Sequence, residues 1–347
     1  MIYDNTLAKV PSPWISRWLG LTALLVFAMV IVGGATRLTG SGLSITEWNP
    51  IIGAIPPLTE ADWQALFDKY KLSSQFKLQN SGMGIDAFQT IFWWEWSHRL
   101  LGRVVGIVSL FPLVTYLFAK LKPKGLLVSL IAVPLLIALQ AALGWYMVAS
   151  GLVDRVSVTQ YRLAAHLVLA MIAFAFVLWV RAGLGRRRQW TNSLNAYVAM
   201  ALLFLVLLQI GAGGLVAGLN AGQGYNTWPT MDGAWIPDGL QAMIPLWANL
   251  FENALTVQFD HRAIAYAILI LASLHAFRSF TLSSTVLVYA ILMQVGLGII
   301  TLLLHVPTMA ALLHQATAVL VLACTVWNLD RQMLTKENAA EVNSGGL

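Results

Sequence analysis

Four histidines stand inside long apolar stretches of this sequence: His98, His166, His261 and His314. Ionisable residues are rare in such stretches and usually mark a functional site. His98 and His261 lie in similar motifs, EWSHR and QFDHR, and His166 and His314 both lie early in a later apolar stretch. Two neutral imidazoles on neighbouring apolar helices are typical of a heme held by two axial ligands. The pattern therefore predicts two paired-histidine sites.

A carboxylate accompanies only one of the two pairs. Glu95 lies three residues before His98, which places both on one helix face, whereas the matching residue before His261 is Gln258. Electron transfer needs no proton acceptor, but oxidation of a C–H bond usually does. We therefore expect the half with Glu95 to carry out chemistry and the other half to pass electrons. The alternative is an ion pair between Glu95 and Arg99 that is neutral overall within the membrane.

Arginines continue the same row. Arg99 and Arg103 follow Glu95 at helical spacing, and Arg37 ends the first apolar stretch. A guanidinium group suits bidentate recognition of carboxylates, so these three residues are candidate partners for heme propionates or for other charges.

The elements that must position these residues are membrane-spanning helices. The chain has 347 residues, of which 58% are hydrophobic and 10% are charged, far fewer charges than in a soluble domain. Backbone polar groups in lipid must be paired within a segment, so apolar runs of this length are helices. The sequence lacks the short alternating strands of a barrel. We expect eight spans, at residues 16–36, 91–119, 125–149, 160–181, 194–218, 256–278, 283–303 and 309–328.

An internal repeat divides these spans into two sets of four. The segment GGATRLTGSGLSITEW at 33–48 aligns without gaps on GGLVAGLNAGQGYNTW at 213–228, and QAALG at 140–144 matches QVGLG at 294–298. Four spans per half give both halves the same orientation, so the repeat is parallel. The prediction is an all-α membrane protein of two tandem four-helix bundles. Its parts are an N-terminal bundle at 1–182, a linker at 183–192, a C-terminal bundle at 193–330 and a tail at 331–347.

The distribution of basic residues predicts the orientation. Cations gather on one side of the spans, at Lys9, Arg17, Lys120, Lys122, Lys124, Arg181, Arg186, Arg187, Arg188, Arg278, Arg331 and Lys336. The positive-inside rule then places both termini in the cytoplasm and the long loops 38–90 and 219–255 outside. The formal charge of +6 is thus a membrane signal, and no nucleic-acid partner is expected. The first span is too long for a cleavable signal, and the single cysteine, Cys324, gives no information on compartment.

These motifs together resemble the heme A synthase family. The resemblance is carried by GGATRLTGSGLSITEWNP, EWSHRLLGR, NLFENALTVQFDHR and the late LLHQ, and it covers about residues 16–330. It implies an enzyme of the bacterial or mitochondrial inner membrane that oxidises the C8 methyl group of heme O to a formyl group through a hydroxymethyl stage. The product would supply cytochrome c oxidase.

The resemblance also implies roles for individual residues. His98 and His166 would ligate the substrate heme, His261 and His314 would ligate a heme B cofactor, and Glu95 would be the catalytic carboxylate. The implied partners are heme O, the lipid bilayer, a heme O synthase and an electron donor or acceptor, and a homo-oligomer stays open. Some members carry a cysteine pair in the first outer loop, which residues 38–90 lack, so this chain would belong to the branch without it.

Other functions remain as alternatives. A di-heme electron carrier of the cytochrome b type would use the same four histidines, but it gives no reason for a carboxylate in one half only. A transporter would have broken helices near the midplane. A zinc site is disfavoured because the H-E-x-x-H motif is missing, and histidines could also form simple helix–helix hydrogen bonds. His275 and His305 have no counterparts in the repeat and are expected to be interfacial.

Overall fold

The structure is a computed structural model that describes residues 12–333, with the exception of 155, 187 and 190. Within these residues all regular structure is helical, apart from an isolated bridge between Met231 and Ala234. The predicted all-α fold is therefore confirmed. Residues 1–11 and most of the predicted tail at 331–347 lie outside the described part of the chain.

Eight helical segments of the described chain are long and apolar enough to cross a membrane, as predicted. The helices that form them are α1 (Pro13–Leu38), α4 (Ile85–Val108) with α5 (Phe111–Phe118), α6 (Lys124–Asp154), α7 (Gln160–Ala182), α8 (Leu194–Gly218), α10 (Ala254–Ser279), α11 (Leu282–Leu303) and α12 (Thr308–Gln332). Each is at least as long as the apolar run that predicts it, except that the second span is divided between two helices.

Pro112 explains that division. It lies in the first turn of α5, where its missing N–H leaves the carbonyl of Val108 without a helical partner and its ring would clash with that carbonyl in a continuous helix. The chain therefore bends at Ser109 and Leu110 between α4 and α5. Pro134, by contrast, is accommodated inside α6.

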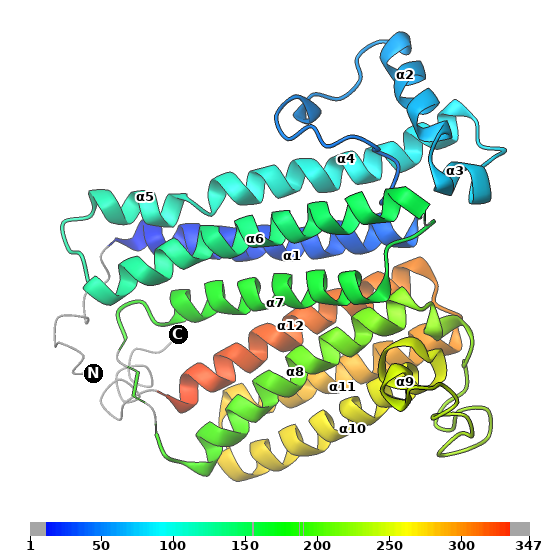
Figure 1. The fold of residues 1–347 in the computed structure, drawn as a ribbon. Coiled ribbons are helices and arrows are strands. Elements are labelled where there is room, and N and C mark those ends of the chain that lie inside the picture. Colours follow the sequence, from blue (N-terminus) through cyan, green and yellow to red (C-terminus); the bar gives the residue numbers. More distant parts are fainter. Residues whose placement is uncertain (1–11, 155, 187, 190, 334–347) are drawn as a thin grey trace.

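The helices form two groups that lie side by side (Figure 1). The first group contains α1, α4, α5, α6 and α7, and the second contains α8, α10, α11 and α12. Helices α1 and α7 pack against α12, and α7 packs along α8, so these four helices form the seam between the groups. The chain crosses from α7 to α8 between Ala182 and Leu194, where the linker at 183–192 is predicted.

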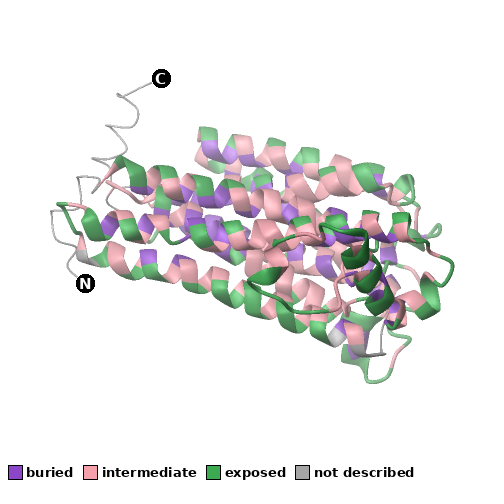
Figure 2. Ribbon diagram, turned by 90° about the horizontal axis from the view of Figure 1, so that it is seen from above, coloured by how far each residue is buried: buried purple, intermediate pink, exposed green. Residues whose placement is uncertain are grey.

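The interior of the molecule lies along the facing sides of these helices. Figure 2 shows buried residues where helices meet and exposed residues on the outward faces and in the loops. The largest buried cluster is aliphatic and draws on both groups, with Leu19 from α1, Leu202 from α8 and Leu322 from α12 completely buried. The two predicted bundles thus share one continuous core.

Glycines bring the two groups into close contact at the seam. A Cβ atom at Gly34 of α1 would overlap the side-chain amide of Gln315 of α12. A Cβ at Gly214 of α8 would lie 2.8 Å from the Cα atom of Ala164 of α7. Gly34 and Gly214 are equivalent positions of the repeat, so the same residue type produces closest approach on both sides.

Arg37 adds a polar contact to the seam at its loop end. It donates to the carbonyl of Ala217 and, over 3.2 Å, to the side chain of Asn220. Arg37 and Ala217 correspond in the sequence repeat, and a contact between equivalent positions is what two similar halves related by an approximate two-fold axis would make. The arrangement is consistent with the predicted duplication.

Short helices cover one end of the bundle, which we call the loop side. They are α2 (Glu60–Lys71), α3 (Ser74–Gln79), η3 (Ala221–Gln223), η4 (Leu246–Ala248) and α9 (Asn249–Glu252), whereas η2 (Ile52–Ala54) lies beside α4. Helix α2 is amphipathic, with Phe67 and Tyr70 buried and most of its other residues exposed. Thr59 and Asp62 form a capping box at its start, and the hydrogen bonds from Thr59 hold the pKa of Asp62 below its usual range.

Aromatic side chains fasten α2 to the first turns of α4. Phe67 and Tyr70 stack on Phe88 at centroid distances of 5.1 and 5.2 Å, and Trp63 meets Phe92 edge-on at 5.0 Å. Helix α3 in turn contacts α6. The first long loop is thus a packed structure on the loop side of the first group.

An ion-pair cluster closes the opposite end. Asp330 of α12 is completely buried and accepts from Arg188 and Arg186 of the linker, at 2.6 and 3.2 Å. The guanidinium of Arg188 also stacks 3.7 Å from the ring centroid of Trp179 of α7. These contacts tie the linker to the last helices of both groups.

Candidate active site

The first predicted pair joins two helices of the first group. His98 of α4 lies against α1, where a Cβ at Gly33 would be 3.0 Å from its Nε2 atom. His166 of α7 lies against α6, where a Cβ at Gly144 would be 2.9 Å from its Cε1 atom. The two imidazoles are close enough to interact electrostatically. Each therefore occupies a notch that exists because a neighbouring helix carries glycine.

The second pair repeats this geometry. His261 of α10 lies against Gly213 of α8, and His314 of α12 lies against Gly298 of α11, with Cβ positions 3.2 and 2.8 Å from the two Cε1 atoms. His261 and His314 also interact electrostatically. All four glycines belong to the sequence segments that define the repeat, so the repeat preserves the notches together with the histidines.

Glutamines contact three of the histidines. The amide of Gln140 donates to the carbonyl of His166 over 3.0 Å, and that of Gln294, its counterpart in the repeat, lies 3.3 Å from Nε2 of His314. The amide of Gln209 lies 3.2 Å from Nε2 of His261 and donates to its carbonyl. Gln140 and Gln294 belong to QAALG and QVGLG, which served above only to align the two halves. The signal for these glutamines was their position one helical turn before the notch glycines Gly144 and Gly298.

The residues of both pairs fit a heme. The Nδ1 atoms of His166, His261 and His314 are buried and have no protein hydrogen-bond partner, which is costly in an apolar interior unless a ligand or water completes the site. Neutral imidazoles from facing helices supply axial ligands, and the apolar helices suit a porphyrin ring. Nowhere in the described chain do three or more His, Cys, Asp or Glu side chains gather as a zinc site would require.

Glu95 lies one helical turn from His98 and is almost completely buried, with 3% of its surface exposed. One carboxylate oxygen accepts from the hydroxyl of Ser44 and the backbone N–H of Ile45, both at 2.8 Å. The other accepts from Nε and Nη2 of Arg99 at 3.0 and 2.6 Å. The Glu95–Arg99 ion pair considered from sequence is therefore present, and it connects α4 to the chain that follows α1.

Gln258 holds the same place in the second half with the opposite polarity. Its amide nitrogen donates to the carbonyls of Ala221 and Tyr225, both at 3.1 Å, and its oxygen accepts from Arg262 at 3.2 Å. Glu95 can only accept, and it receives an N–H and an O–H from the corresponding loop. The two sites thus share one scaffold, and a buried negative charge is present in only one of them.

The arginines of the first half contact the protein itself. Arg99 donates to the carbonyls of Ile45 and Glu47, both at 2.9 Å, and Arg103 donates to the carbonyls of Pro50 and Asn49, at 2.8 and 3.0 Å. Nη1 of Arg103 is buried without a protein partner. The expectation that Arg37, Arg99 and Arg103 meet heme propionates stays a prediction, for which Arg103 has a free donor.

The two unpaired histidines differ from each other. His305 is exposed in the turn between α11 and α12, as expected of an interfacial residue. The expectation for His275 is wrong. This side chain is 2% exposed, and its Nε2 atom lies 3.1 Å from the side-chain amide of Asn328 on α12. That amide in turn accepts from Ser283 of α11, so His275 belongs to a buried polar contact among three helices.

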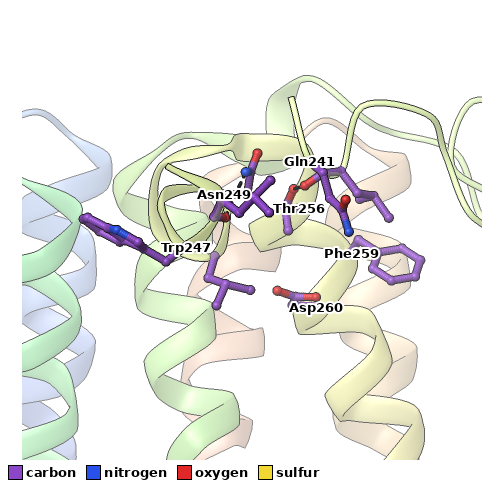
Figure 3. Close-up of a pocket in the computed structure, with 9 residues that line it drawn as sticks. Gln241, Trp247, Asn249, Thr256, Phe259 and Asp260 are labelled. Atoms are coloured by element: carbon purple, nitrogen blue, oxygen red, sulfur yellow. Dashed lines mark hydrogen bonds between the residues drawn. The ribbon is translucent and has the colours of Figure 1, made fainter. Parts of the chain in front are cut away.

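A separate cavity of about 420 Å³ opens on the loop side of the second half (Figure 3). Trp247 and Leu250 line it from η4 and α9, and Phe259 and Asp260 line it from α10. It contains none of the four paired histidines. Five of its lining residues lie within the motif NLFENALTVQFDHR, which gave no indication of a cavity.

The fold and these sites define a class: a multi-pass helical membrane protein with two paired-histidine sites, one of which has a buried carboxylate. A sequence model of the family described as "Cytochrome oxidase assembly protein" matches residues 16–326. The chain belongs to this family. It is 52% identical over 316 residues to a protein named "Heme A synthase" from Azorhizobium caulinodans, an alignment that covers 88% of this chain and 90% of the relative.

Further relatives carry the same name. The protein of Rhodopseudomonas palustris strain BisA53 is 50% identical over 339 residues, covering 93% of this chain and 92% of its own. That of Bartonella tribocorum is 48% identical over 337 residues, covering 93% and 94%. The resemblance stated from the sequence motifs is therefore confirmed over nearly the whole chain.

Proposed function

We propose that this protein is a heme A synthase that oxidises the C8 methyl group of heme O to a formyl group, with a hydroxymethyl group as the intermediate stage. The observation that carries the proposal is the asymmetry between Glu95 and Gln258 within two otherwise similar paired-histidine sites. The family and the names of the relatives support it. The proposed product is heme A for cytochrome c oxidase, and the proposed location is the inner membrane of a bacterium, with both termini in the cytoplasm.

The two pairs take different roles in this proposal. His98 and His166 hold the substrate heme in the first half, and His261 and His314 hold a heme B cofactor in the second. Heme B, when bound, supplies one-electron redox chemistry. The notch glycines leave room for each imidazole, and the neighbouring glutamines contact His166, His261 and His314. Gln209 and Gln294 contact the rings of His261 and His314 and orient them, as surrounding hydrogen bonds do for metal ligands, whereas Gln140 contacts the backbone carbonyl of His166.

Glu95 is the proposed catalytic residue. Each stage breaks a C–H bond of the methyl carbon as a C–O bond forms, passes two electrons to the proposed electron acceptor and releases the hydrogen as a proton; a carboxylate one turn from a proposed substrate-heme ligand is placed to accept that proton. Arg99 balances its charge in the buried site, and Ser44 and Ile45 fix its orientation. Gln258 has the same shape without a charge, so the second half offers no equivalent acceptor.

The test is extraction and mass analysis of the hemes in protein purified from cells that also make heme O. Heme B together with heme O, hydroxylated heme O or heme A is the expected result. Two equivalents of unaltered heme B alone would instead favour the di-heme electron carrier, and Glu95 would then be only a structural partner of Arg99.

A further inference from the structure

The chain that follows α1 does not stay at the loop side. From Ser44 it runs back along the outer flank of α4, reaches the level of Arg103, and turns at η2 before it rises to α2 (Figure 1). Its contacts with α4 show this path: Ser44 meets the carbonyl of Ile91, and the carbonyls of Asn49 and Pro50 meet Arg103. We call residues 47–55 the returning segment.

The contact between α4 and α1 gives the depth of this segment. A Cβ at Gly102, next to Arg103, would lie 3.3 Å from the side chain of Met29. Met29 is nine residues before the last residue of α1, Leu38, or about 14 Å along the helix axis. Helix α1 is about 39 Å long and the hydrocarbon core about 30 Å thick, so Arg103 lies about 9 Å inside that core.

Non-helical backbone at such a depth must have its polar groups paired. Arg99 and Arg103 donate to three carbonyls of the segment, those of Glu47, Asn49 and Pro50, and Arg99 also donates to the carbonyl of Ile45 just before it. The tip pairs its own: Gly53 donates to Asn49, Ala54 to Ile51 and Ile55 to Ile52, at 3.0 to 3.1 Å. Arg99 and Arg103 thus complete the hydrogen bonding of carbonyl groups in this segment.

The side chains of the tip are suited to lipid. Ile51, Ile52 and Ile55 are 84%, 76% and 66% exposed, and they form a contiguous apolar patch that the rest of the described chain leaves uncovered. Such a patch is unfavourable in water and marks a contact surface. At the depth of Arg103, the surrounding medium is acyl chain.

The second half has no arginine that corresponds to Arg103. The residue that matches Arg103 in the repeat is Tyr266, whose hydroxyl accepts from the indole of Trp228 over 3.0 Å. Tyr266 has one hydroxyl donor in place of the several donors of a guanidinium group, so it cannot replace the two carbonyl contacts of Arg103. The second half therefore has one arginine at this place, Arg262, which donates to the carbonyls of Tyr225, Thr227 and Thr230, and it lacks the second.

We propose that the tip of the returning segment, residues 50–55, is embedded in the loop-side leaflet of the bilayer, with Ile51, Ile52 and Ile55 against lipid acyl chains and Arg103 pairing the backbone that enters the leaflet. This inference does not rest on the proposed enzymatic function.

Site-specific fluorescence of the full-length protein in lipid nanodiscs tests it. A Cys324→Ala background removes the single native cysteine, and an environment-sensitive probe is attached at Ile52→Cys or at Leu72→Cys. Leu72 is the matched control, because it is apolar, 72% exposed and in the same loop, but at the end of α2. We expect the Ile52 probe to be quenched by lipids brominated in the acyl chain and to show a roughly fivefold lower iodide quenching constant than the Leu72 probe. Equal iodide quenching at both positions would overturn the proposal.

The role of Arg103 has its own test in the same probe. Arg103→Met leaves the carbonyl of Pro50 unpaired in lipid and that of Asn49 with only its bond from Gly53, so the Ile52 probe should move toward water and approach the iodide quenching of the Leu72 probe. Lys69→Met is the control, because Lys69 contacts only the side chain of Glu47 and its loss should leave the probe unchanged. An Ile52 probe that stays in lipid in Arg103→Met would contradict the assigned role of Arg103.

Discussion

Glu95 and Gln258 occupy equivalent places in the two halves, and they contact the chain after α1 and after α8 with opposite hydrogen-bond polarity. Their arginines do not differ in this way: Arg99 and Arg262 both donate to carbonyls at matching positions of the following loops. The scaffold is thus held constant while one side chain changes from amide to carboxylate. A difference confined to one group is readily tested by exchange.

Glu95→Gln should retain heme but lower the yield of heme A by about 100-fold or more, because the proton acceptor is lost. The matched variant, Gln258→Glu, changes only the second half. It keeps Glu95, so it should retain the synthesis of heme A. The measurement is heme extraction and mass analysis, with melting temperature as a check on folding. An unchanged yield of heme A in Glu95→Gln would remove the catalytic role.

His261→Ala and His314→Ala should each deplete heme B, because each variant would remove one of the two residues proposed to hold the heme iron. The pyridine hemochrome assay and the low-spin absorption spectrum measure this loss. His275→Ala is the control: this histidine also lies between helices but bonds to Asn328, and its loss should leave the heme content unchanged. A normal low-spin spectrum in both ligand variants would refute the assignment.

Gly298→Ala should displace the imidazole of His314 and weaken heme binding in the second half. The added Cβ would lie 2.8 Å from Cε1 of His314, whereas a Cβ at Gly296, on the same helix, meets nothing within 4 Å. Overpacking of this kind costs about 1–3 kcal/mol. Heme content per protein should fall in Gly298→Ala and stay normal in Gly296→Ala, and equal heme content in the two variants would argue against the notch.

Asp330→Asn should lower the thermal stability markedly. The carboxylate is completely buried between two arginines, and removal of one charge from a buried ion pair costs about 3–5 kcal/mol. Asp238→Asn, on the exposed loop, is the control. The melting temperature in detergent measures both, and equal values would show that the linker does not depend on this cluster.

Much of this architecture could be predicted from the sequence because lipid imposes simple rules. The lengths of the apolar runs predicted the eight spans. The repeated motifs identified His98 and His261 as equivalent positions of the two halves, and likewise His166 and His314. The break before Pro112 was missed because overall hydropathy continues across it. The burial of His275 was missed because its partner, Asn328, lies on a helix that is far from it in the sequence.

The returning segment escaped prediction for a different reason. Ile51, Ile52 and Ile55 lie among prolines and glycine in a stretch too short to span a membrane, so composition indicates a loop. Only the contacts of Arg99 and Arg103 with the carbonyls of that stretch place it at depth. The glycine notches likewise depend on which helices become neighbours, although the glycines themselves are visible in the repeat.

The seam between the halves also bears on how variants should be studied. Gly33 contacts His98, the adjacent Gly34 contacts Gln315, and Gln315 is bonded to His314. His98 of the first pair is therefore connected to His314 of the second through two peptide-linked pairs of residues and two close contacts, His98 with Gly33 and Gly34 with Gln315. A substitution at either pair should perturb the absorption spectrum of both, so spectral assignments gain their meaning from reciprocal variants measured side by side.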